Sequence, residues 1–167
     1  MRARSKRAGR LDEAAARERC LRLLEKRPRA AAELRQRLSE AGFARNVMEA
    51  VLTDLEQVGL VDDEEFARLW VAQRTAYGAG RHKLRWELRR KGVHDNLIRR
   101  LVDEAIDDDT ELQQALDLAQ RRLRGQAVEG PALLRLRRFL VGRGYGFGTV
   151  EGVMRRLTSQ EDLSDAC

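Results

Sequence analysis

The sequence predicts an all-α protein made of three tandem three-helix repeats. Its 167 residues are rich in Ala, Leu, Arg and Glu, which favour helix, and include only two prolines and 5% aromatic residues. The pattern Leu-x3-Leu-x3-Gly, followed by an apolar residue, occurs three times, with its glycines 50 and 52 residues apart. A repeat period of about 50 residues is typical of stacked helical modules.

This pattern predicts the middle helix of each repeat. Leucines four residues apart lie on one face of a helix. A glycine directly after such a face allows the positive φ of a C-terminal cap, and the apolar residue that follows can pack back on the helix. The three copies are Leu34-x3-Leu38-x3-Gly42-Phe43, Leu84-x3-Leu88-x3-Gly92-Val93 and Leu136-x3-Leu140-x3-Gly144-Tyr145.

One helix is predicted before each middle helix and one after it. The preceding helices are expected over 14–25, 64–76 and 112–122, with buried faces that include Cys20, Leu21 and Leu24; Phe66, Leu69 and Trp70; and Leu112, Leu116 and Ala119. The following helices show apolar residues at i, i+3, i+4 and i+7 spacing. These begin at Val47, Leu97 and Val150.

Several residues predict where helices start and turn. Asp62 suits the N-cap of the second repeat, with Glu65 as its capping partner, and Asp108 or Asp109 suits that of the third. Pro131 fits the first turn of a helix. Residues 78–80, which contain two glycines, are expected to form a flexible joint.

The repeats are therefore expected at residues 11–59, 60–108 and 109–158. Residues 1–10 carry five basic residues and no acid, and we expect them to form a disordered tail, as we do residues 159–167. No apolar run approaches the roughly 20 residues of a membrane span, and no apolar segment follows the basic N-terminus. Two distant cysteines favour a reducing, cytoplasmic setting. We expect a monomer, because each apolar stripe is used within the stack.

Charge is distributed in blocks. The formal net charge is +6. Residues 49–65 contain seven acids and no base, whereas residues 81–100 contain eight bases and two acids. Such alternation predicts separate acidic and basic faces, of which the basic ones suit a polyanion and the acidic ones a basic protein surface.

Catalysis finds little support in the sequence. His82 and His94 are the only histidines, and neither lies near a candidate nucleophile. The glycines between 142 and 148 lack the preceding strand and the Lys-Ser/Thr ending of a phosphate loop. The acids at 62–63 and 107–109 fit helix N-termini better than a metal site. We therefore expect no enzyme activity, no metal and no cofactor.

The middle helices of the second and third repeats are the candidate binding surface. The several N–H donors of an arginine guanidinium suit phosphate oxygens, and a helix with one basic face can follow a phosphate backbone. The alternative is an ordinary solvated helix. The candidates are Arg81, Lys83, Arg85, Arg89, Arg90, Lys91, Arg135, Arg137, Arg138 and Arg143.

Trp86 is a further candidate on the same helix. It lies about 200° around the helix from Leu84 and Leu88, so it does not share their face. It would either pack between neighbouring repeats or anchor a protein partner.

A helix, a glycine turn and a second helix also suggest a helix-turn-helix reader of duplex DNA. Arg45 and Asn46, or Asp95 and Asn96, would then begin the recognition helix. Three similar copies favour a shared scaffold over one reading head. A helical adaptor that binds no nucleic acid is a third possibility.

The chain resembles the RecX family of bacterial proteins that regulate the RecA recombinase. The resemblance runs from about residue 13 to 157. It is carried by Glu33-Leu34, Leu38, Gly42-Phe43, Gly59-Leu60-Val61-Asp62-Asp63, Phe66-Ala67, Trp70-Val71, Arg74, Gly80, Glu87-Leu88, Lys91-Gly92-Val93, Leu140 and Arg143-Gly144-Tyr145.

The resemblance implies an elongated, curved array of three modules in the cytoplasm. It also implies binding to the RecA filament on single-stranded DNA, with mostly inhibitory effect on the recombinase, and no catalysis. Duplex DNA is a further possible partner. Ala30 stands where the family often has a serine, which removes an N-cap worth on the order of 1 kcal/mol.

Overall fold

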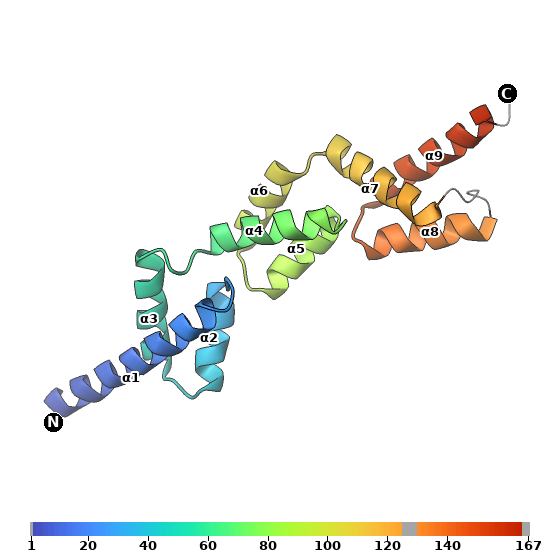
Figure 1. Ribbon diagram of the computed structural model, residues 1–167. Helices are drawn as coiled ribbons and strands as arrows, with labels where there is room; N and C mark the ends of the chain where they lie inside the picture. The colour runs from blue at the N-terminus through green and yellow to red at the C-terminus, as the bar shows by residue number, and fades with distance from the viewer. Residues whose placement is uncertain (1, 125–129, 165–167) are drawn as a thin grey trace. The chain divides into compact units, whose positions relative to one another are not determined.

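The computed structural model describes residues 2–124 and 130–164, with the side chains of residues 12–124 and 130–159. Over these residues all the regular secondary structure is α-helical, which confirms the all-α prediction (Figure 1). In chain order they are α1 (Arg2–Leu24), α2 (Ala31–Glu40), α3 (Arg45–Gln57), α4 (Asp63–Ala76), α5 (Arg81–Arg90), α6 (Asp95–Ala105), α7 (Asp108–Leu123), α8 (Gly130–Gly142) and α9 (Phe147–Ser164).

The chain divides into two compact units. The first unit comprises Met1–Arg68 and Arg89–His94, and the second comprises Leu69–Leu88 and Asp95–Cys167. Helices α4 and α5 therefore each contribute residues to both units. No helix among the described residues is long and apolar enough to cross a membrane.

The core of the first unit lies between α1, α2 and α3. Leu34 and Leu38 of α2 are fully buried, as is Cys20 of α1. They pack with the apolar stripe of α3, in which Val51, Leu52 and Leu55 are buried. The predicted i, i+3, i+4 and i+7 stripe is thus the face that α3 buries.

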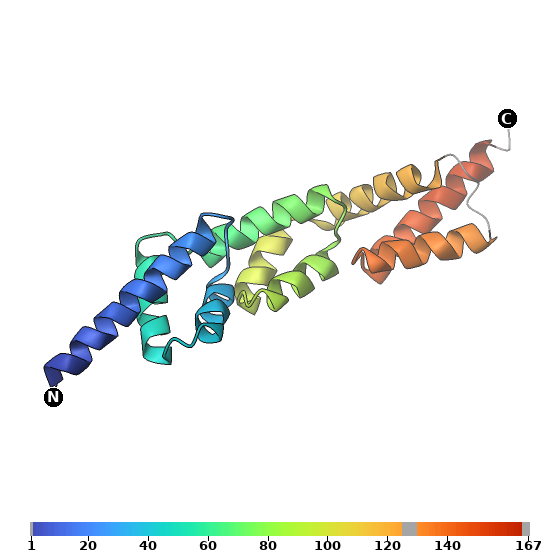
Figure 2. The same ribbon diagram turned by 60° about the horizontal axis from the view of Figure 1, so that its bottom comes forward.

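The second unit has an equivalent core between α7, α8 and α9. Helices α8 and α9 lie side by side in both ribbon views (Figures 1 and 2). The buried residues are Ala115, Leu116, Ala119, Leu136, Leu140, Tyr145, Val150, Val153, Met154 and Leu157.

The predicted glycine caps are confirmed. Gly42, Gly92 and Gly144 have φ of +85°, +81° and +88°. After Gly42, the amide of Phe43 donates to the carbonyl of Leu38 at 3.2 Å, and Tyr145 makes the same bond to Leu140. Only glycine readily adopts a backbone conformation with positive φ, so the glycine positions predict where these helices end.

Two helix starts illustrate how the caps work. Asp62 accepts hydrogen bonds from the amides of Glu64 and Glu65, at 2.8 and 3.0 Å, and so caps α4 as predicted. Helix α7 is capped by Asp107, whose carboxylate accepts from the amide of Thr110 at 2.7 Å. The expectation of Asp108 or Asp109 was wrong by one residue or two.

The structure differs from expectation at both ends of the chain. Helix α1 begins at Arg2, where a disordered basic tail was expected over 1–10. The first proline is Pro28, and Arg and Ala favour helix, so nothing in the composition stops α1 earlier. Helix α9 continues to Ser164, past the predicted repeat boundary at 158, and residues 165–167 lie outside the described part.

Leu69 was expected in the buried face of α4 but is 49% exposed. The buried residues of α4 are Phe66, Ala67 and Val71. Leu69 lies two residues from both Ala67 and Val71, about 200° around the helix, which turns it away from the core.

Candidate nucleic-acid interface

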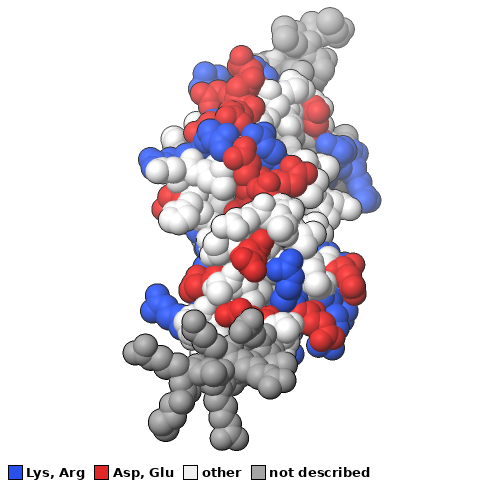
Figure 3. Space-filling model, turned by 90° about the vertical axis from the view of Figure 1, so that its left-hand side faces the viewer, with Lys and Arg blue, Asp and Glu red and all other residues white. Residues whose placement is uncertain are grey.

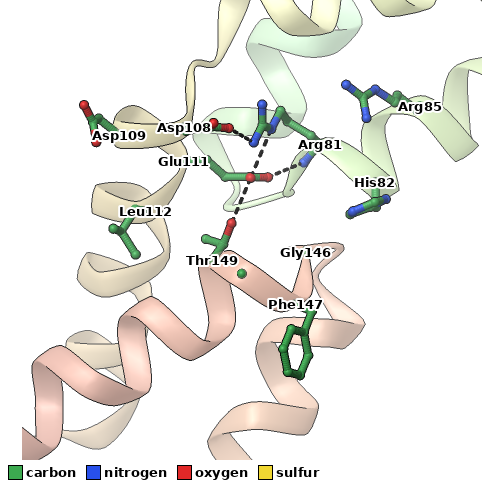
Figure 4. Close-up of a pocket in the computed structure, with 11 residues that line it drawn as sticks. Arg81, His82, Arg85, Asp108, Asp109, Glu111, Leu112, Gly146, Phe147 and Thr149 are labelled. Atoms are coloured by element: carbon green, nitrogen blue, oxygen red, sulfur yellow. Dashed lines mark hydrogen bonds and ion pairs between the residues drawn. The ribbon is translucent and has the colours of Figure 1, made fainter.

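A buried carboxylate joins α7 to the start of α5. Glu111 is only 2% exposed, one turn into α7, on the same face as the buried Ala115 and Ala119. One carboxylate oxygen accepts from the backbone amide of Arg81 at 2.8 Å. The other accepts from Arg81 Nε at 3.0 Å and from the hydroxyl of Thr149 at 3.1 Å (Figure 4). Glu111 therefore caps a helix that lies 30 residues earlier in the chain.

Arg81 belongs to this arrangement rather than to an outward basic face. Its side chain is 22% exposed and pairs with Asp108 as well as Glu111. Burial alone would lower the pKa of the Arg81 guanidinium, but the hydrogen bonds and charges of Asp108 and Glu111 outweigh it and raise the pKa. In this position the Arg81 charge is neutralised within the fold.

The first unit uses the same device. The N-cap of α2 is Ala30, which offers no side-chain cap. In its place the carboxylate of Asp63, at the start of α4, accepts from the amide of Ala31 at 2.8 Å. An acid at the start of a first helix therefore caps the preceding middle helix in both units. From the sequence, we expected such acids to stabilise only the helices that they begin.

Glycines make the second contact between successive repeats. The amide of Gly80 donates to the carbonyl of Arg143 at 2.9 Å, and that of His82 donates to Gly144 at 3.1 Å. A Cβ on Gly80 would lie 2.5 Å from the carbonyl oxygen of Gly144. The flexible joint expected over 78–80 is thus a close backbone contact, because only glycine permits this approach.

Two further predicted arginines tie helices together within a repeat. Arg137 of α8 binds Glu151 of α9 at 2.8 Å, and Arg85 of α5 pairs with Asp103 of α6. In the first repeat Arg35 binds Glu49 at 2.9 Å in the same way. One arginine of each middle helix therefore holds the third helix of its own repeat.

Three other predicted residues lie at the end of α5 or directly after it. Arg89, Arg90 and Lys91 line a cavity of about 330 Å³ in the first unit, together with Arg37 and Glu33 of α2. Glu33 binds Arg27 at 2.6 Å. Burial raises the pKa of the Glu33 carboxyl, but the hydrogen bond and charges of Arg27, Arg29 and Lys91 outweigh it and lower the pKa. The cavity is therefore predominantly basic.

A second basic groove lies between the end of α7 and α8. It has a volume of about 520 Å³, and its apolar lining residues include Leu118, Leu136 and Phe139. No acidic residue is among its described lining residues. Its basic residues are Arg121, Arg122, Arg124, Arg135 and Arg143. Only Arg135 and Arg143 were predicted, although the excess of bases after residue 120 was visible in the sequence.

The remaining three predicted residues also lie outside both cavities. Lys83 is half-buried, and its backbone packs so closely on Gly144 that a Cβ there would overlap it. Arg138 is exposed on α8. Trp86 is 54% exposed, so the structure does not bury it between repeats.

The surface does not separate by charge on the face shown in Figure 3. Acidic and basic side chains lie next to one another there. Acids of the 49–65 block pair with arginines from other helices, as Glu49 does with Arg35 and Asp54 with Arg17. A run of acidic residues in the sequence therefore lies next to basic side chains in the structure. The expectation of separate acidic and basic faces does not hold on this face.

Comparisons with known proteins place these features in a family context. The family model described as "RecX, first three-helix domain" matches residues 16–55, and that described as "RecX, second three-helix domain" matches residues 62–101. The chain is 42% identical to the regulatory protein RecX of Amycolatopsis mediterranei (strain U-32) over 143 residues, which cover 84% of this chain and 81% of the relative. It is 36% identical to regulatory protein RecX of Mycobacterium leprae (strain Br4923), with 86% of each chain covered.

Two solved structures have a similar fold. The crystal structure of RecX from Lactobacillus salivarius has a TM-score of 0.78 and 15% sequence identity, and the match covers 88% of this chain and 97% of the other. A crystal structure of a regulatory protein RecX has a TM-score of 0.74 and 23% identity, with 87% and 73% covered. These identities support the helical repeat fold alone.

Proposed function

Because the chain belongs to the RecX family of regulatory proteins, we propose that it regulates homologous recombination by binding the RecA recombinase on its single-stranded DNA filament. Binding biases the filament towards a state that adds subunits or exchanges strands less readily. The net effect on the recombinase is inhibition.

The observation that carries this proposal is the predominantly basic cavity at the end of α5. Arg89, Arg90 and Lys91 gather there with Arg37 of α2. A partly enclosed cluster of bases suits the phosphates of a DNA strand or an acidic protein surface, both of which a recombinase filament presents. Trp86, on the same helix and 54% exposed, offers an aromatic anchor for the protein component.

The acidic stretch 49–65 has a smaller part in the proposal than the sequence suggested. Glu49 and Asp54 pair with arginines of the same unit. Asp62 and Asp63 cap α4 and α2. These four carboxylates already bind groups within the protein, so we assign partner binding to the basic residues.

Binding to three ligands tests the proposal: single-stranded DNA, duplex DNA and preformed RecA filaments, each across a salt series. We expect tightest binding to the filament. A helix-turn-helix transcription factor would instead bind duplex with a sequence preference of several kcal/mol. An adaptor would bind no DNA even at low salt, where a basic protein binds best.

A pair of charge reversals locates the contact. Arg89→Glu with Arg90→Glu should weaken filament binding at least tenfold. Arg99→Glu with Arg100→Glu is the matched control, because these are also adjacent exposed arginines of the second repeat but lie outside the cavity. If both variants lost the same affinity for the filament, the loss would be explained by net charge alone, and the cavity would not be the contact site.

A further inference from the structure

We propose that the groove between the end of α7 and α8 is a separate binding site for the phosphodiester backbone of single-stranded DNA. The inference rests on the proposed function for the identity of the polyanion. It assigns the DNA contact to the third repeat, and leaves the end of α5 for the filament protein.

Among the residues that the structure describes, no carboxylate forms an ion pair with an arginine of the groove. Arg81, Arg85 and Arg137 each pair with a carboxylate, as structural arginines do. Arg121 and Arg143 of the groove differ, because their hydrogen bonds go to neutral backbone carbonyls. Arg121 Nε donates to the backbone of Asp117 at 3.2 Å, and Arg143 donates to the backbone of Tyr77 at 2.8 Å. These bonds orient the guanidiniums and leave their charge for a ligand.

Phe139 holds two of the guanidiniums in place. The Arg122 guanidinium lies 4.5 Å from the centre of the ring, and that of Arg143 lies 5.2 Å from it. Cation–π attraction at such distances restricts side chains that would otherwise sample many rotamers. Less conformational entropy is then lost when an anion binds. Phe139 is therefore a positioning residue rather than a platform for bases.

The shape of the groove favours a single strand over a duplex. The groove, of about 520 Å³, is lined by both leucines (Leu118, Leu123 and Leu136) and arginines, so it offers apolar contact as well as charge. A single strand can place phosphates on the arginines, and its sugars and the flat faces of its unpaired bases against the apolar lining residues. A duplex keeps its bases stacked inside and would reach only the rim.

The test is binding of the full chain to a fluorescent oligo(dT) without RecA, by anisotropy across a salt series. The groove variant is Arg122→Gln with Arg135→Gln. The control is Arg155→Gln with Arg156→Gln, which removes the same charge from exposed positions outside the groove. We expect the groove variant to bind about tenfold more weakly, with a salt dependence shallower by roughly 0.7 for each lost phosphate contact. The control should change less than about twofold.

Variants of Phe139 test the positioning role. Phe139→Leu keeps this lining position apolar but removes the aromatic ring, so the affinity for oligo(dT) should fall. The slope of the salt dependence should be retained, because all five arginines remain. Phe139→Tyr keeps the ring and should restore the affinity. Circular dichroism and thermal melts of each variant verify that the fold is intact.

The possible failures are distinguishable. Unchanged oligo(dT) binding by the groove variant overturns the inference. If the same variant loses binding to a poly-glutamate peptide, the groove binds an acidic protein surface and not DNA. In either case an effect of the wild-type chain on RecA leaves the proposed function standing. Groove-dependent DNA binding with no effect on RecA would sustain the site and reject the proposed function.

Discussion

Glu111 binds both the backbone amide and the guanidinium of Arg81, at 2.8 and 3.0 Å, and so begins a helix that belongs to the preceding repeat. Asp63 binds the amide of Ala31 at the equivalent place in the first unit. The repeats are therefore joined by carboxylates that cap helices, in addition to apolar packing. A repeat of about fifty residues has a small core, so such contacts contribute a substantial share of stability.

Loss of the Glu111 charge should destabilise the second unit. In Glu111→Gln the Arg81 guanidinium and amide lose a charged acceptor in a buried position, and we expect a cost of about 2 kcal/mol in unfolding free energy. Urea denaturation at pH 7 measures it. Asp109→Asn is the control, an exposed acid two residues away that should change stability by less than about 0.5 kcal/mol. Equal stability of the two variants would show that the buried carboxylate is not needed.

The glycine contacts predict a difference between two positions with the same backbone. Gly42 and Gly144 have φ of +85° and +88°, but a Cβ on Gly42 meets open space, whereas one on Gly144 overlaps Lys83. Gly42→Ala should cost about 1 kcal/mol from backbone strain alone. Gly144→Ala should cost about 2 kcal/mol more, because it also forces the repeats apart. Equal losses of unfolding free energy in the two variants would mean that Lys83 moves away from residue 144 at no energetic cost.

Glu87 predicts a pH dependence of stability. It accepts from Arg74 Nε at 2.8 Å and from the indole of Trp70 at 3.0 Å. Burial raises the pKa of the Glu87 carboxyl, but these bonds outweigh it and hold the pKa below the ordinary 4.5. A lowered folded-state pKa stabilises the fold above the unfolded-state pKa, and this contribution is lost as pH falls through the folded-state value.

Glu87→Gln should therefore cost about 1 kcal/mol at pH 7, and the difference from wild type should shrink as pH falls below 4.5. Urea unfolding at a series of pH values measures this. Glu56→Gln, at an exposed acid, controls for net charge. A difference between wild type and Glu87→Gln that stays constant between pH 7 and pH 3 would contradict the assignment.

Trp86 predicts a functional defect without a folding defect. Because the side chain is 54% exposed, Trp86→Ala should change stability by less than about 1 kcal/mol. If the ring anchors a protein partner, filament binding should fall about tenfold or more. Tyr77→Ala removes another exposed aromatic from the same unit and should bind normally. Normal binding by Trp86→Ala would exclude Trp86 from the interface.

The helices and their ends were predictable because their signals are local. Leu84, Leu88 and Gly92 show the period of a helix and its stop within nine residues, and the copies at 34–42 and 136–144 confirm the pattern. Asp62 was assigned correctly for the same reason, since it caps the helix that follows it directly.

The candidate site was predicted less well, because it depends on which helices lie alongside one another. Helical periodicity placed Arg81, Arg85 and Arg137 away from the leucines, but it does not show that each meets an acid from another helix. Equally, Arg122 and Arg135 form one groove only because the end of α7 packs on α8. Glu111 did leave a signal, an acid four residues before Ala115 on an otherwise apolar face.

ATP hydrolysis by RecA on single-stranded DNA, titrated with this protein, tests the central claim most directly. We predict that the rate falls at ratios below one molecule per RecA subunit, and that the Arg89→Glu with Arg90→Glu variant needs a concentration about tenfold higher. An unchanged rate at stoichiometric amounts of the wild-type protein would contradict regulation of RecA by this chain.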